Sequence, residues 1–116
     1  MAKMIRISVR QDRDGFIKAF FVKGHADYDE AGRDIVCAAV SAVVQTAVIG
    51  LTDIAGLKPE YNQQDENGFL QCILPEGLTE QDRNTASIIL NTMLVGLKSI
   101  QYGYSDFISI KEREVD

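Results

Sequence analysis

The residues best suited to chemistry lie between positions 24 and 41, where the sequence reads GHADYDEAGRDIVCAAVS. His25 is the single histidine of the chain, and Cys37 is one of its two cysteines. A thiol near the N-terminus of a helix has a lowered pKa, because the partial positive charge and unpaired N–H groups there stabilise the thiolate. A nearby imidazole lowers that pKa further and can later protonate a leaving group. The segment therefore holds the groups of a cysteine nucleophile with a histidine base, provided that the fold brings His25 to Cys37.

Each of these residues also has a structural interpretation. Cysteine is among the most buried residue types, so spacing alone favours Cys37 as a core residue of an apolar helix. Asp34 suits a helix N-cap first and the orientation of His25 second. Ser41 lies one turn after Cys37 on the same helix face, where it suits packing or a contact near the thiol. Cys72 alternates with leucines inside a predicted strand, away from any helix end, and we expect it in the core.

The segment from Gly24 to Arg33 is predicted to be a polar loop. Its acidic side chains are Asp27, Asp29 and Glu30. With His25 they suggest a metal site, but their spacing fits no calcium loop, and a cysteine adds nothing for a hard ion. Two cysteines and one histidine also cannot supply the four ligands of a structural zinc site. We therefore expect a solvated loop with no metal or cofactor. Beside an active site it would favour a basic substrate, with its glycines as the hinges of a lid.

Composition favours one small globular domain. The chain has 116 residues, of which 46% are hydrophobic and 25% charged, and its formal net charge is -5. An acidic balance argues against a nucleic-acid binder driven by electrostatics, so we expect no direct nucleic-acid partner. The first ten residues, MAKMIRISVR, lack the apolar region of a secretory signal, and the cysteines are too sparse for a disulfide framework. These features favour a cytoplasmic protein.

One long segment, from Ile35 to Thr52, carries no charged residue. Its length is near that of a transmembrane helix, but four polar residues interrupt it and alanines and glycines dilute its hydropathy. We interpret it as a central helix buried on most of its faces, and we expect no membrane association. In so short a chain, a helix of this kind needs more cover than one sheet and one other helix provide, which favours a dimer.

The remaining pattern predicts the elements that would position the site. Alternation from Met4 to Arg10 and the turn-forming Asp-Gly before Phe16 indicate two antiparallel strands. Thr79, with Asp82 three positions on, resembles a capping box at the start of a second helix. The expected elements are strands 4–10 and 16–23, a helix from Ile35 to about Ala55 capped by Asp34 and Gly56, strands 59–65 and 69–74, the helix after Thr79, and a last strand from Phe107 to about Val115. The order ββαββαβ predicts an α+β, two-layer domain with a mostly antiparallel sheet and two helices.

The motif formed by Gly24-His25-Ala26, Gly32 and the run DIVCAAVS from Asp34 to Ser41 resembles the signature of the ribosomal-processing cysteine protease family, Prp. The resemblance covers essentially residues 1–116 and implies one cysteine protease domain. It implies a cytosolic homodimer that removes the short N-terminal extension of bacterial large-subunit ribosomal protein twenty-seven, cutting after a phenylalanine. The family's catalytic histidine falls on His25, its nucleophile on Cys37, its aspartate on Asp34 and its helix serine on Ser41.

Three functions follow as hypotheses. The first is an endopeptidase that acts on a basic ribosomal-protein precursor, with backbone N–H groups at the start of the Ile35 helix as the simplest oxyanion donors. The second is a non-catalytic, ribosome-associated binding or assembly module whose loop grips the same partner. The third is a metal-dependent hydrolase, which activity in excess EDTA would exclude. Thiol alkylation separates the first two, because a thiolate at a helix end reacts faster than a buried thiol.

Overall fold

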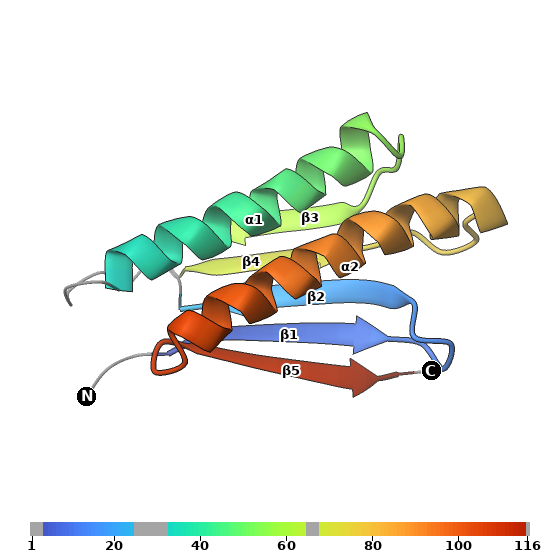
Figure 1. Cartoon of the computed structure of the whole chain (residues 1–116). Coiled ribbons are helices and arrows are strands. Elements are labelled where there is room, and N and C mark those ends of the chain that lie inside the picture. Colours follow the sequence, from blue (N-terminus) through green and yellow to red (C-terminus); the bar gives the residue numbers. More distant parts are fainter. Residues whose placement is uncertain (1–3, 25–32, 65–67, 116) are drawn as a thin grey trace.

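The computed structural model describes residues 4–24, 33–64 and 68–115 (Figure 1). In chain order, these residues form β1 (Ile5–Gln11), β2 (Ile17–Lys23), α1 (Arg33–Asp53), β3 (Glu60–Gln64), β4 (Phe69–Ile73), α2 (Glu80–Gly103) and β5 (Ile108–Glu114). The predicted α+β class and the order ββαββαβ are confirmed.

One sheet contains all five described strands in the order β3-β4-β2-β1-β5. The hairpin pairs β1 with β2 and β3 with β4 are antiparallel, as is the pair of β2 with β4. The exception is β5, which runs parallel to β1 because α2 carries the chain back across the sheet. Both described helices cover the same face of this sheet, so the molecule has two layers (Figure 1).

The core lies between the sheet and the helices. Ile5, Ile7 and Val9 alternate along β1 and are at most 1% exposed, while Arg6 and Arg10 between them are exposed. Successive side chains of a strand point to opposite faces, so the three buried residues face the helices and the two arginines face away. The period-two pattern of β1 therefore determines which face of the sheet becomes the core.

Within the single chain, α1 is not buried on most of its faces, which differs from the prediction. Its buried side chains repeat along one side, and Val36, Val40 and Leu51 are at most 1% exposed. On the opposite side, Ile35 is 64% and Ile49 56% exposed, because only the sheet and α2 cover the helix. The segment from Ile35 to Asp53 has the length and hydropathy of a membrane span. The core helix of a globular protein can have the same length and hydropathy.

The ends of α1 differ from the prediction by about two residues. The helix begins at Arg33, so Asp34 is a first-turn residue and not the predicted N-cap. The helix ends at Asp53, before the predicted Ala55. Gly56 then takes a φ of 69°, and the amide of Leu57 donates to the Leu51 carbonyl at 2.9 Å. A glycine at this point closes the helix as expected, because a positive φ costs it little.

The start of α2 matches its prediction. Thr79 is the N-cap, and its hydroxyl oxygen accepts a hydrogen bond from the Asp82 amide at 3.1 Å. The buried face of the helix is built by Ala86, Leu90, Met93, Leu94 and Leu97.

Candidate active site

The end of β2 determines where the chain leaves the sheet just before His25. Gly24 has a φ of 85°, and its amide donates to the Gly68 carbonyl at 2.9 Å. A Cβ atom at this position would lie 2.9 Å from the backbone oxygen of Met4. Both the backbone conformation and the close approach require glycine here. Gly24 is thus held by its contacts with Met4 and Gly68 at the point where the predicted polar loop begins.

Cys37 lies near the start of α1, at the same end of the molecule as the end of β2 (Figure 1). It is the fifth residue of the helix rather than the third after the cap, because the helix begins earlier than predicted. The Cα–Cβ bonds of a helix tilt toward its N-terminus, so that of Cys37 tilts toward the first turn of α1. The N–H groups of that turn have no acceptor within the helix and carry its partial positive charge. This placement suits a thiolate, even though Cys37 is only 6% exposed.

The supporting residues of the motif lie on the same helix. Ser41 is half-buried and follows Cys37 by one turn on the same face, at the spacing that makes helical side chains neighbours. Asp34 belongs to the first turn of α1, three residues before Cys37.

The other predicted site residues lie outside the described part of the chain. These are His25, Asp27, Asp29, Glu30 and Gly32. The pairing of His25 with Cys37, the acidic substrate loop and the lid therefore stay predictions. Among the described residues, no group of three or more histidine, cysteine or acidic side chains could hold a metal ion.

Cys72 has the core environment that its pattern predicts. It lies in β4 opposite Phe20 and Tyr61 of the neighbouring strands, and it is 1% exposed. Desolvation by burial raises the pKa of its thiol to about 12. Its burial and its raised pKa both disfavour Cys72 as the nucleophile.

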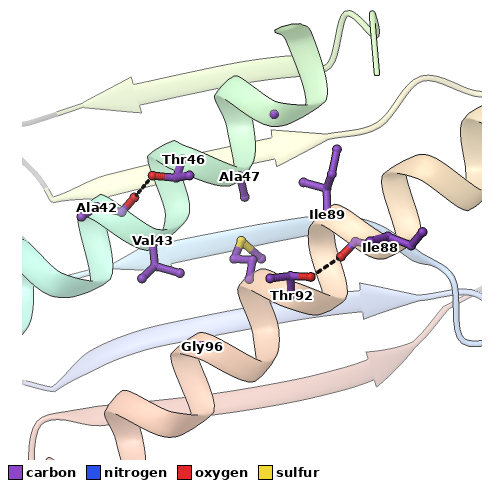
Figure 2. A pocket seen from close by; sticks show the side chains of 10 residues that line it. Ala42, Val43, Thr46, Ala47, Ile88, Ile89, Thr92 and Gly96 are labelled. Atoms are coloured by element: carbon purple, nitrogen blue, oxygen red, sulfur yellow. Dashed lines mark hydrogen bonds between the residues drawn. The ribbon is translucent and has the colours of Figure 1, made fainter. Parts of the chain in front are cut away.

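A separate groove of about 570 Å³ lies between α1 and α2 (Figure 2). Its lining includes no titratable side chain, and its two threonine hydroxyls donate to carbonyls of their own helices, from Thr46 to Ala42 at 2.6 Å and from Thr92 to Ile88 at 2.7 Å. The groove is thus apolar and lacks groups for catalysis. Sequence reasoning did not identify it, although small residues at Ala42, Gly50 and Gly96 are a signal that the two helices leave a furrow between them.

Comparison with known proteins identifies the family of this chain. The family model for the cysteine protease Prp matches residues 4–109. The ribosomal processing cysteine protease Prp of Bacillus subtilis is 34% identical over 107 residues, which cover 92% of this chain and 96% of that protein. The Prp of Staphylococcus aureus strain Mu50 is 31% identical over 92% of this chain and 97% of its own length.

Solved structures show the same fold. The crystal structure of the S. aureus protease Prp with a substrate peptide superposes with a TM-score of 0.84 at 29% identity, covering 95% of this chain and all of that one. The Streptococcus mutans protein SMU.848 superposes with a TM-score of 0.86 at 23% identity, covering 97% of each chain, which shows the fold alone.

Proposed function

Since the chain belongs to the Prp cysteine protease family, we propose that it is the cytoplasmic endopeptidase that removes the N-terminal extension of large-subunit ribosomal protein twenty-seven, cutting after phenylalanine. The observation that carries this proposal is the position of Cys37 near the N-terminal end of α1, at the same end of the sheet as the end of β2, after which the segment with His25 follows. Two further points support a peptide substrate. The S. aureus relative is described with a substrate peptide, and the net charge of -5 suits a basic ribosomal protein.

The proposed chemistry uses Cys37 as nucleophile and His25 as base and acid. His25 accepts the thiol proton, and the Cys37 thiolate attacks the scissile carbonyl carbon to form a tetrahedral intermediate. The proposed donors to its oxyanion are backbone N–H groups at the start of α1. The C–N bond then breaks, His25 gives its proton to the leaving amine, and a water molecule hydrolyses the thioester to restore Cys37. Asp34 and Ser41 support this site from the same helix, as positioning residues rather than reacting groups.

Peptide cleavage tests these roles. A synthetic peptide that spans the extension is incubated with the wild type and with Cys37→Ala and His25→Ala, and the products are separated by mass spectrometry. We expect each variant to lose about three orders of magnitude or more in kcat/KM while it keeps a cooperative unfolding transition. Cys72→Ala is the matched control and should cleave normally, because its thiol is buried in β4.

Two results would contradict the proposal. Full activity of Cys37→Ala would exclude Cys37 as the nucleophile. A wild type that binds the precursor without cleaving it would favour the non-catalytic assembly module.

We also propose that the protein is a homodimer whose second copy covers the α1–α2 groove. Ile88 and Val95 on α2 are 70% and 67% exposed, and Ile49 on α1 is 56% exposed, so apolar area surrounds the groove on both helices. Ile88→Glu should shift the sedimentation coefficient from dimer to monomer, because it places an unpaired charge in the interface. Ile54→Glu is the control, since Ile54 is 77% exposed but does not line the groove. A wild type that sediments as a monomer at tens of micromolar would exclude this dimer.

A further inference from the structure

The sheet face that the helices leave uncovered is strongly basic. Register places the side chains of Arg6 and Arg10 of β1, Lys23 of β2, and Lys111 and Arg113 of β5 on this face, and all five are exposed. We call these five residues the basic face. Arg6 and Arg10 are four residues apart along β1, a distance of about 13 Å, and β5 and β2 are two strand spacings apart, about 10 Å. The cations therefore form one continuous patch.

Like charges lie directly opposite each other in this patch. Arg6 pairs in register with Lys23 across the antiparallel strands, and Arg10 pairs with Arg113 across the parallel ones. Such pairs destabilise a sheet, and opposite charges at the same positions would stabilise it. Folding alone therefore gives no reason for this arrangement, whereas a bound polyanion would relieve the repulsion.

Nothing described in the chain neutralises the basic face. In residues 4–24, 33–64 and 68–115, salt bridges are formed by Lys18, Arg83 and Lys98, and not by any of the five cations. The only carboxylate that register places on this side of the described strands is Glu60, on the distant edge strand β3. Five cations and one carboxylate give the face a formal charge of +4, which leaves −9 on the rest of the chain. The net charge of -5 is thus the sum of a basic face and a strongly acidic remainder of the chain.

The face also has a groove and an aromatic ring. A groove of about 370 Å³ runs across β5, β1 and β2, and four of the five cations line it together with Ser8, Phe21 and Ser109. The guanidinium carbon of Arg10 lies 4.5 Å from the centre of the half-buried Phe21 ring. Stacked arginine and aromatic groups on a sheet are platforms for unpaired bases, and the surrounding cations and hydroxyls suit phosphates.

We propose that the basic face binds single-stranded RNA, with the phosphates on the five cations and a base against Arg10 and Phe21. A membrane surface fits less well, because the large hydrophobic side chains that register places on this face, Phe21, Phe69 and Ile73, are half-buried. The large exposed ones of the described residues lie elsewhere. An acidic peptide would use the cations but not the ring. Cys37 lies in the helical layer on the opposite side of the sheet, so RNA and the proposed peptide substrate would occupy different surfaces.

Fluorescence anisotropy of a labelled twelve-nucleotide polyuridine RNA measures this binding. If three to five phosphates are contacted, raising the salt from 50 to 200 mM should weaken binding by about 20- to 130-fold. Phosphatidylglycerol vesicles and polyglutamate serve as competitors at equal charge concentration. Displacement of the RNA only at much higher competitor concentration supports the proposal, and displacement at equal concentration overturns it, as does the absence of binding at 50 mM salt.

Two double variants distinguish the effect of the basic face on RNA binding from the effect of the net charge. Arg6→Gln with Lys111→Gln removes two cations of the face, and Arg13→Gln with Lys58→Gln removes two exposed cations from loops, so both proteins have the same formal charge. The first should weaken RNA binding at least tenfold and reduce the salt slope by about 1.4, while the second stays within about twofold of the wild type. Equal weakening by both variants overturns the proposal.

Cleavage of the peptide substrate should be unchanged in the first variant. This result distinguishes a failed RNA site from a failed protease assignment, because each assay reports on a different face of the molecule.

Discussion

Replacement of Gly24 by alanine should lower the free energy of unfolding by about 2–5 kcal/mol. A φ of 85° costs a residue with a side chain about 1–2 kcal/mol. The added Cβ would also lie 2.9 Å from the backbone oxygen of Met4, a contact with rigid main chain. Overpacking of this kind costs about 1–3 kcal/mol. Because Gly24 immediately precedes His25, we also expect peptide cleavage to fall by more than the unfolded fraction explains.

Urea denaturation followed by circular dichroism measures the stability change, and two glycines provide matched controls. Gly15 has a φ of 84° with nothing within 4 Å of its Cβ position, so Gly15→Ala isolates the conformational cost. Gly103 has open space and an ordinary φ at the end of α2, so Gly103→Ala should be neutral or slightly stabilising. The reasoning is refuted if Gly24→Ala loses no more stability than Gly15→Ala, because the contact with Met4 would then carry no cost.

Two further predictions concern titratable groups. At pH 8, iodoacetamide should modify Cys37 in the native protein much faster than Cys72, whose thiol has a pKa of about 12 because of its burial, and mass spectrometry of tryptic peptides identifies the site. Equal rates at both thiols would contradict the activation of Cys37. The hydrogen bond from Lys98 lowers the pKa of Glu112, so part of the stability present at neutral pH should be lost as pH falls through the folded pKa of Glu112. Lys98→Met should flatten this acid dependence in thermal unfolding, and an unchanged slope would exclude the pair as its source.

Much of the fold was predictable because local sequence patterns determine where its strands and helices form. The alternation of β1 separates a buried from an exposed face, and the Thr79 cap marks the start of α2. The covered side of α1 was not predictable, since an uncharged segment has no polar side to identify the solvent face. The parallel pairing of β5 with β1 was also hidden, because alternation within a strand does not specify its partner.

The roles of the candidate site residues stay predictions, and the structure adds the location of Cys37 and the contacts of Gly24. The motif predicts Cys37 as the nucleophile, and the structure shows that it is the fifth residue of α1, near the N-terminal end of the helix. The restraint on Gly24 comes from Met4 and Gly68, which are distant in sequence, so no local pattern reveals it. The basic face was missed for a different reason. Net charge is a sum over the chain, and only the alternating arginines of β1 hint that the cations gather on one side.

The pairing of β1 with β5 also has a consequence for synthesis. Of the described strands, β1 is synthesised first. It is bonded along one side to β2 and along the other to β5, the last described strand, with hydrogen bonds from Ile5 to Phe107 at 2.8 Å and from Val115 to Gln11 at 2.7 Å. Until β5 emerges, a nascent chain exposes one open edge of β1, which is a site for aggregation. Once in place, β5 forms the outer edge of the sheet, and its charged sequence ISIKERE makes that edge a poor template for another strand.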